Sequence, residues 1–229
     1  MTGHKLSFAL RLIDDFTGRK IGRTSCVFKT DERFIPTIYK EEGVYLFLEP
    51  MECPCTVQIE AQDYFPGMVL IDRRDLDPKY PVVDVRLYHK PGGQFPYRCS
   101  LCCGRIEPPQ PGKPFMVYGI SSVESGYALK AVKDMDDASV IELTGYNKEK
   151  LPGRVFGLGN EKDLEVFVIT EKTGINDYAI SGKLKKKHQK GDRLIRIYRT
   201  YADGDGNYVL PVAEGTEDRI TVVTGIANA

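Results

Sequence analysis

The sequence contains no tryptophan and only three histidines, although it extends over 229 residues. Sugar-binding platforms recruit tryptophan more often than tyrosine, so its absence argues against a carbohydrate partner and leaves only tyrosine-based contacts for one. Nothing in the sequence ties His4, His89 or His188 to a nucleophile. Ser121 and Ser122 lack the strand–turn–helix setting of a nucleophile elbow. We therefore assign no catalytic residue and expect a protein that is not an enzyme.

The chain also lacks net charge, because 32 lysines and arginines balance 32 aspartates and glutamates. Binding to nucleic acid requires a basic surface that neutralises phosphates, so we expect no nucleic-acid partner. The one dense basic run, residues 183–193, is a short segment of the kind that usually faces water. No apolar stretch approaches the ~20 residues that cross a bilayer, and no membrane span is expected.

The N-terminal residues 1–15 do not show the basic, apolar and small-residue order of a secretory signal. We therefore expect the chain to be cytoplasmic when it is made. Stable disulfides are rare in that reducing compartment, so clustered cysteines are expected to be free or to bind metal more often than to pair.

The sequence contains many short segments with the residue pattern of β-strands. Apolar and polar residues alternate, or β-branched and aromatic residues cluster, in short segments separated by Gly, Asn and Asp turns. These segments are residues 6–14, 44–50, 55–62, 82–90, 164–172, 193–201 and 219–225. Short strands at this spacing predict an all-β protein built from β-sandwich or barrel-like domains.

Composition divides the chain into two such domains, in keeping with a length above the ~100–150 residues of a typical single domain. Residues 91–117 are rich in proline and cysteine, and proline cannot donate to a sheet. We therefore predict a first domain over 1–90, a stiff connector over 91–117 and a second domain over 118–229.

The connector carries three of the six cysteines, at positions 99, 102 and 103. Cys99 and Cys102 have the spacing of half a zinc site, and Cys53 and Cys55 could supply two more thiolates. Such a zinc ion would clip the connector to the first domain, and its binding energy would become folding energy. Free thiols and a disulfide remain the alternatives, and no other cofactor is expected.

The first half resembles a prealbumin-like (transthyretin-like) or carboxypeptidase-regulatory-like β-sandwich. The resemblance rests on the segments DDFTGRKIG, EEGVYLFLEP and VQIEAQDYFP and covers residues 14–66. It implies a non-enzymatic module that acts as a rigid spacer or docking surface, in some members a sugar-binding one.

The second half is similar to a β-module of phage tails and phage tail-like contractile injection particles. The matching segments are residues 128–146 and 157–198, with Met135, Asp136 and Asp137 at a place where the pattern has a loop glycine. This resemblance implies a structural or adaptor role in such a particle, as cap, baseplate or spike component, with other protein subunits as partners. The chain would then leave the cell only within a released particle. A cell-surface adhesion or carbohydrate-binding protein is the alternative function.

Overall fold

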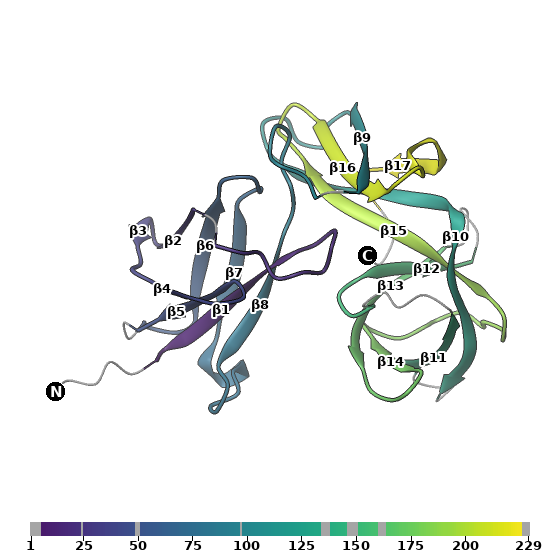
Figure 1. Ribbon diagram of the computed structural model, residues 1–229, viewed down its shortest axis with the longest axis horizontal. Coiled ribbons are helices and arrows are strands. Elements are labelled where there is room, and N and C mark those ends of the chain that lie inside the picture. The colour runs from purple at the N-terminus through teal and green to yellow at the C-terminus, as the bar shows by residue number, and fades with distance from the viewer. Residues whose placement is uncertain are drawn as a thin grey trace. The chain divides into compact units, whose positions relative to one another are not determined.

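The computed structural model of the chain describes residues 6–23, 25–48, 51–96, 98–133, 138–145, 151–159 and 164–225. It divides into two compact units, residues 1–94 and 95–229, each built from strands (Figure 1). The predicted all-β class is confirmed. His4 and Met135–Asp137 lie outside the described residues. The described residues contain no helix that is both long and apolar enough to cross a membrane.

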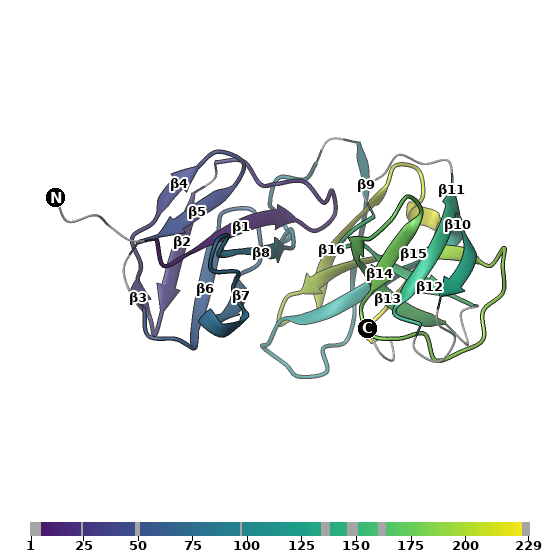
Figure 2. The same ribbon diagram turned by 90° about the horizontal axis from the view of Figure 1, so that it is seen from below.

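The first unit is a sandwich of two four-stranded sheets (Figure 2). One sheet has the order β4 (Ile38–Lys40), β5 (Val44–Phe47), β1 (Phe8–Asp14) and β8 (Val82–Leu87). The other has the order β3 (Arg33–Phe34), β2 (Cys26–Thr30), β6 (Cys55–Ala61) and β7 (Gly67–Ile71). A short 3-10 helix, η1 (Arg73–Asp75), follows β7. The pairing of β1 with β8 is parallel, and the other strand pairs of the unit are antiparallel.

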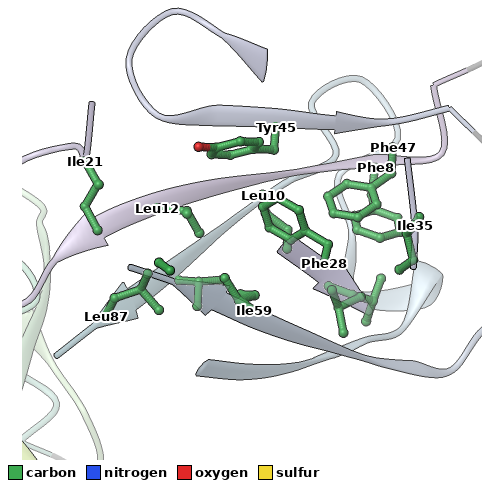
Figure 3. Close-up of a cluster of buried hydrophobic side chains, with 14 residues drawn as sticks. Phe8, Leu10, Leu12, Ile21, Phe28, Ile35, Tyr45, Phe47, Ile59 and Leu87 are labelled. Carbon is green, nitrogen blue, oxygen red and sulfur yellow. The ribbon is translucent and has the colours of Figure 1, made fainter. Parts of the chain in front are cut away.

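Successive side chains of each strand point to opposite faces of its sheet, so that every second side chain lies between the two sheets. In β6, Val57, Ile59 and Ala61 are buried, whereas the residues between them are exposed, as a period of two requires. Figure 3 shows the side chains of both sheets meeting in a single core. Phe8 and Phe47 stack there with ring centroids 4.4 Å apart, and Phe28 meets Phe47 edge-on.

The described residues of the second unit form nine strands in one continuous sheet that closes on itself. The strands are β9 (Cys99–Arg105), β10 (Phe115–Lys133), β11 (Val140–Gly145), β12 (Val155–Leu158), β13 (Glu165–Lys172), β14 (Asp177–Ile180), β15 (Arg193–Ala202), β16 (Asn207–Ala213) and β17 (Ile220–Val223), with the 3-10 helix η2 (Glu217–Arg219) before the last. The order β10-β11-β14-β13-β12-β15 returns to β10, because β10 also pairs with β15. Six strands therefore form a closed barrel, which leaves no free edge among them.

The strand β10 is long because it serves two parts of this unit. Its C-terminal half pairs with β11, and its N-terminal half pairs with β17, while β15 runs along both halves. The register between β10 and β15 shifts twice, between Ile120 and Glu124 and between Glu124 and Ala128. Such bulges increase local twist, which a small barrel needs in order to close. The barrel is filled by buried apolar side chains, with Phe156, Phe167 and Ile141 among the largest.

The predicted connector over residues 91–117 requires a correction. Residues 99–105 form β9, which pairs along its whole length with β16, so that this stretch belongs to the sheet of the second unit. The prolines do not prevent this, because they lie on either side of the strand and none lies within it. The division between the units falls between Gln94 and Phe95, and β10 already begins at Phe115.

Candidate functional site

A buried polar cluster joins three segments at one end of the first sandwich. Asp14 is the last residue of β1, His89 follows β8, and Tyr64 lies in the turn between β6 and β7. Asp14 Oδ2 lies 2.5 Å from His89 Nε2 and accepts a hydrogen bond from the Tyr64 hydroxyl at 3.2 Å. Its Oδ1 accepts hydrogen bonds from the backbone N–H of Thr17 at 2.6 Å and from the Thr17 hydroxyl at 2.8 Å.

These contacts and the burial of the cluster shift the pKa values of Asp14 and Tyr64. Burial alone would raise the pKa of Asp14, but the hydrogen bonds from His89 and Thr17 outweigh it, and the pKa is lowered. The pKa of Tyr64 is raised by its own burial and by the charge of Asp14. At neutral pH, Asp14 is therefore an ionised acceptor and Tyr64 a protonated donor. The oxygens of Asp14 are occupied by groups that hold β1, β8 and the β6–β7 turn together, which indicates a structural clamp.

A second polar cluster, in the second unit, anchors the backbone of the basic run, residues 183–193, which was predicted to face water. Glu165 in β13 accepts hydrogen bonds from the backbone N–H groups of Lys185 at 2.5 Å and Lys186 at 3.2 Å. His188 Nε2 lies 2.8 Å from Glu165, and its Nδ1 lies 3.6 Å from Asp192. Burial raises the pKa of Glu165, but the backbone and histidine hydrogen bonds lower it further than burial raises it. The lysines of the loop are exposed, whereas its backbone is fastened to the barrel.

We expect Glu165→Gln to loosen this loop, because an amide replaces a charged acceptor of three hydrogen bonds. Hydrogen bonds to charged groups contribute about 1.5–3 kcal/mol, so amide exchange over residues 183–192 should accelerate by about one to two orders of magnitude. Exchange followed by mass spectrometry measures this. Glu171→Gln, at an exposed position of the same strand, is the matched control and should leave the loop unchanged. Equal exchange in the two variants would contradict the role assigned to Glu165.

The zinc clip predicted from the cysteine spacing stays a prediction, and the structure describes the local setting of each of its four cysteines. Cys53 and Cys55 belong to the first unit and Cys99 and Cys102 to the second. Cys99 and Cys102 are three residues apart in a regular strand, so their side chains point to opposite faces and cannot form the knuckle of a zinc site. Cys99 Sγ instead donates to the carbonyl of Pro96, and Cys102 Sγ to the carbonyl of Glu217. Within the part of the chain that the structure describes, no three His, Cys, Asp or Glu side chains are grouped to hold a metal ion, and no disulfide joins any of the six cysteines.

We therefore expect the protein to contain no stoichiometric zinc after purification under reducing conditions. A chelator should leave its melting temperature unchanged, because no folding energy would come from metal binding. Elemental analysis together with thermal unfolding tests both statements. If the protein contained one zinc ion per chain and Cys99→Ser lost it, the result would support the zinc clip instead.

The Asp- and Gly-rich segment between β15 and β16 is explained by turn chemistry. Asp203 accepts hydrogen bonds from the backbone N–H groups of Asp205 at 3.0 Å and Asn207 at 2.8 Å. Desolvation raises the pKa of Asp203, but the hydrogen bond from the Asn207 side-chain amide and these backbone bonds together lower it further than desolvation raises it. Its carboxylate thus closes the hairpin, as aspartate does in many turns.

The most exposed apolar side chains of the first unit lie on the outward side of the β3-β2-β6-β7 sheet, called here the outer face. Phe34 in β3 is 72% exposed, and Met68 and Leu70 in β7 are 71% and 66% exposed. Strand register places Phe34, Lys29, Gln58 and Met68 in one row across the four strands. Met68 and Leu70 are neighbours on this face, and large apolar side chains that are exposed next to each other typically mark a surface that contacts another molecule.

Comparisons of the chain with protein-family models, with curated proteins and with solved structures found no match.

Sequence reasoning missed the outer face and the Asp14 cluster. The segment Gly67–Ile71 carries a signal, because four uncharged residues follow the Pro-Gly turn, as a short strand often does. Asp14 looked like an ordinary turn residue of the DDFTGRK segment. Its partner His89 is 75 positions away in sequence, and no local pattern joins the two.

Proposed function

We propose that this protein is a non-enzymatic structural or adaptor subunit of a phage tail-like contractile injection particle and that it acts through contacts with other protein subunits. The observation that carries the proposal is the outer face, where Phe34, Met68 and Leu70 are exposed on a sheet with a packed core behind it. A rigid sheet presents such side chains in fixed positions, which suits a subunit that must dock in one orientation.

Two further features support the same function. The polar clusters around Asp14 and Glu165 are used to fasten turns and loops, so that they stiffen the two units. Residues 128–146 and 157–198 resemble a β-module of contractile particles, and this resemblance suggests the kind of assembly to which the subunit would belong. In that setting the closed barrel of the second unit is a second rigid module of the subunit, in addition to the sandwich.

The test is to isolate assembled particles from cells that produce the chain and to measure its stoichiometry in them by mass spectrometry. We expect a fixed stoichiometry for the wild type and a large loss for the double variant Met68→Lys, Leu70→Lys. Tyr80→Lys, which changes a side chain that is 61% exposed and lies outside the outer face, should be incorporated normally. Absence of the wild-type chain from particles, together with binding to a glycan array, would instead support the adhesion alternative.

A further inference from the structure

The strand β7 is an edge of its sheet. It pairs with β6 on one side, and no described strand pairs with it on the other. The unpaired side of an edge strand presents backbone N–H and C=O groups that a further strand can bind. Met68 and Leu70 point from this edge to the outer face, next to the uncharged side chains of Gln58 and Thr56.

This edge lacks the protection found on the other edges of the sandwich. The edge strand β3 carries Arg33, β4 carries Lys40, and β8 carries Asp84 and Arg86. Charged residues on an edge discourage strand addition, because pairing would desolvate them. The sequence of β7, Gly-Met-Val-Leu-Ile, contains no charge and no proline. Of the four edge strands in the described part of the first unit, β7 is thus the one open to pairing.

Resting on the proposed function, we propose that the partner at this edge is a second copy of the chain, which pairs antiparallel with β7 about a two-fold axis at Val69. The two β3-β2-β6-β7 sheets would then join into one sheet of eight strands. In this register Met68 of one copy lies opposite Leu70 of the other, and Val69 lies opposite Val69. Both exposed apolar side chains are covered by the same contact.

The absence of charge around β7 suits a second copy of the chain. A two-fold axis brings each residue close to its own counterpart, so any charge near the axis would meet a like charge. Neither β7 nor the adjoining outer-face residues Thr56 and Gln58 carry one. The nearest charge on the outer face of β6, Glu60, is paired with Lys29 at 2.7 Å. The edge therefore meets the condition for self-pairing, and its own sequence supplies the uncharged, apolar strand that it would accept.

The contact is small, because it consists of one five-residue strand pair and two apolar side chains from each copy. Interfaces well below the ~1,200 Å² of standard complexes are weak, so we expect a dimer that forms reversibly as concentration rises. Sedimentation equilibrium of the full chain under reducing conditions tests this. Wild type should pass from monomer to dimer, and Met68→Lys, Leu70→Lys should remain monomeric over the same range.

Matched variants test the site and the register. Phe34→Lys, which changes an equally exposed side chain at the opposite edge, should dimerise like the wild type. Chains with Met68→Lys mixed with chains with Leu70→Glu should form a mixed dimer more readily than either chain pairs with itself, because the introduced ammonium of one chain would face the introduced carboxylate of the other. Circular dichroism of each variant verifies that it is folded.

A wild-type chain that stays monomeric at every concentration would overturn this inference. So would oligomers that grow beyond the dimer, since they would indicate head-to-tail pairing of β7 with another edge. Loss of dimerisation in Phe34→Lys would have the same consequence. The proposed function is tested separately by particle incorporation, so a monomeric chain that still enters particles and depends on Met68 and Leu70 would leave that function standing with a different partner at β7.

Discussion

Asp14→Ala should lower the free energy of unfolding of the first unit by about 3–5 kcal/mol, as expected when one partner of a buried hydrogen-bonded pair is removed. The substitution takes away the acceptor of His89, Tyr64 and Thr17 together, and Asp14 and His89 are both only 5% exposed. Buried groups that lose their hydrogen-bond partner cost about 1–3 kcal/mol each. Amide exchange of the peptides that contain β1 and β8 measures the effect within this unit.

Asp84→Ala is the matched control for this prediction. Asp84 lies in β8 and accepts two hydrogen bonds from Arg11 of β1, at 2.6 and 2.8 Å, so that it also joins these two strands. Because the Asp84 side chain is 44% exposed, water can replace most of the hydrogen bonding that Arg11 loses. The free energy of unfolding should therefore fall by less than about 1 kcal/mol. Equal losses in the two variants would show that the Asp14 cluster is not the clamp described above.

The same cluster predicts a dependence of stability on pH. The pKa of Asp14 is lowered in the folded chain from its ordinary value of 3.8, so the ionised carboxylate stabilises the fold. This contribution is complete above the ordinary value and is lost as the pH falls through the folded value. The difference in unfolding free energy between wild type and Asp14→Asn, which does not titrate, should therefore shrink when the pH is lowered from neutral to below 3.8. A difference that is constant over that range would contradict the assignment.

The second large effect is expected in the apolar core. Phe47→Ala should lower the free energy of unfolding by about 3–5 kcal/mol, because Phe47 is fully buried and its truncation leaves a cavity between the two sheets. The loss includes the stacked contact with Phe8 at 4.4 Å and the edge-on contact with Phe28 at 5.3 Å. Figure 3 shows these rings at one end of the core. Urea unfolding monitored by circular dichroism, compared at constant slope, measures the change.

Phe34→Ala makes the same chemical change on the outer face, where 72% of the side chain is exposed. Its cost should be below about 1 kcal/mol, since it forfeits little more than the contact with Lys29, whose Nζ lies 5.2 Å from the ring centroid. Phe47→Leu, which keeps most of the apolar volume, should fall between the two. A Phe47→Ala variant no less stable than Phe34→Ala would contradict the placement of Phe47 in the core.

Local pattern was enough to identify many of the strands. The segments expected at 6–14, 55–62, 164–172 and 193–201 correspond to β1, β6, β13 and β15 with ends within two residues. Alternation and turn residues act over a few positions, so they can be read without knowing the partner strand. The pattern failed for β10, where Gly119, Ser121 and Gly126 interrupt the apolar alternation and two bulges shift the register.

The prediction for residues 91–117 failed for a related reason. The proline content averaged over the segment indicated a connector. The proline-free residues 99–105 within it nevertheless form β9, which pairs with β16, more than a hundred residues away in sequence. The zinc clip was predicted from the same segment, where the structure places Cys99 and Cys102 within β9. Two cysteines at knuckle spacing can share an ion in a turn, but a strand directs them to opposite faces.

The amino-acid order alone determined the all-β class, the positions of many strands and turns and the balance of charge, because each depends on neighbouring residues or on composition. Only the tertiary structure decided that β10 and β15 close a barrel, that Asp14 meets His89 and that β7 is left as an uncharged edge. The physical reason is that strand pairing and burial join residues distant in sequence. Which backbone groups and side chains are covered is then a property of the whole sheet, and no short segment specifies it.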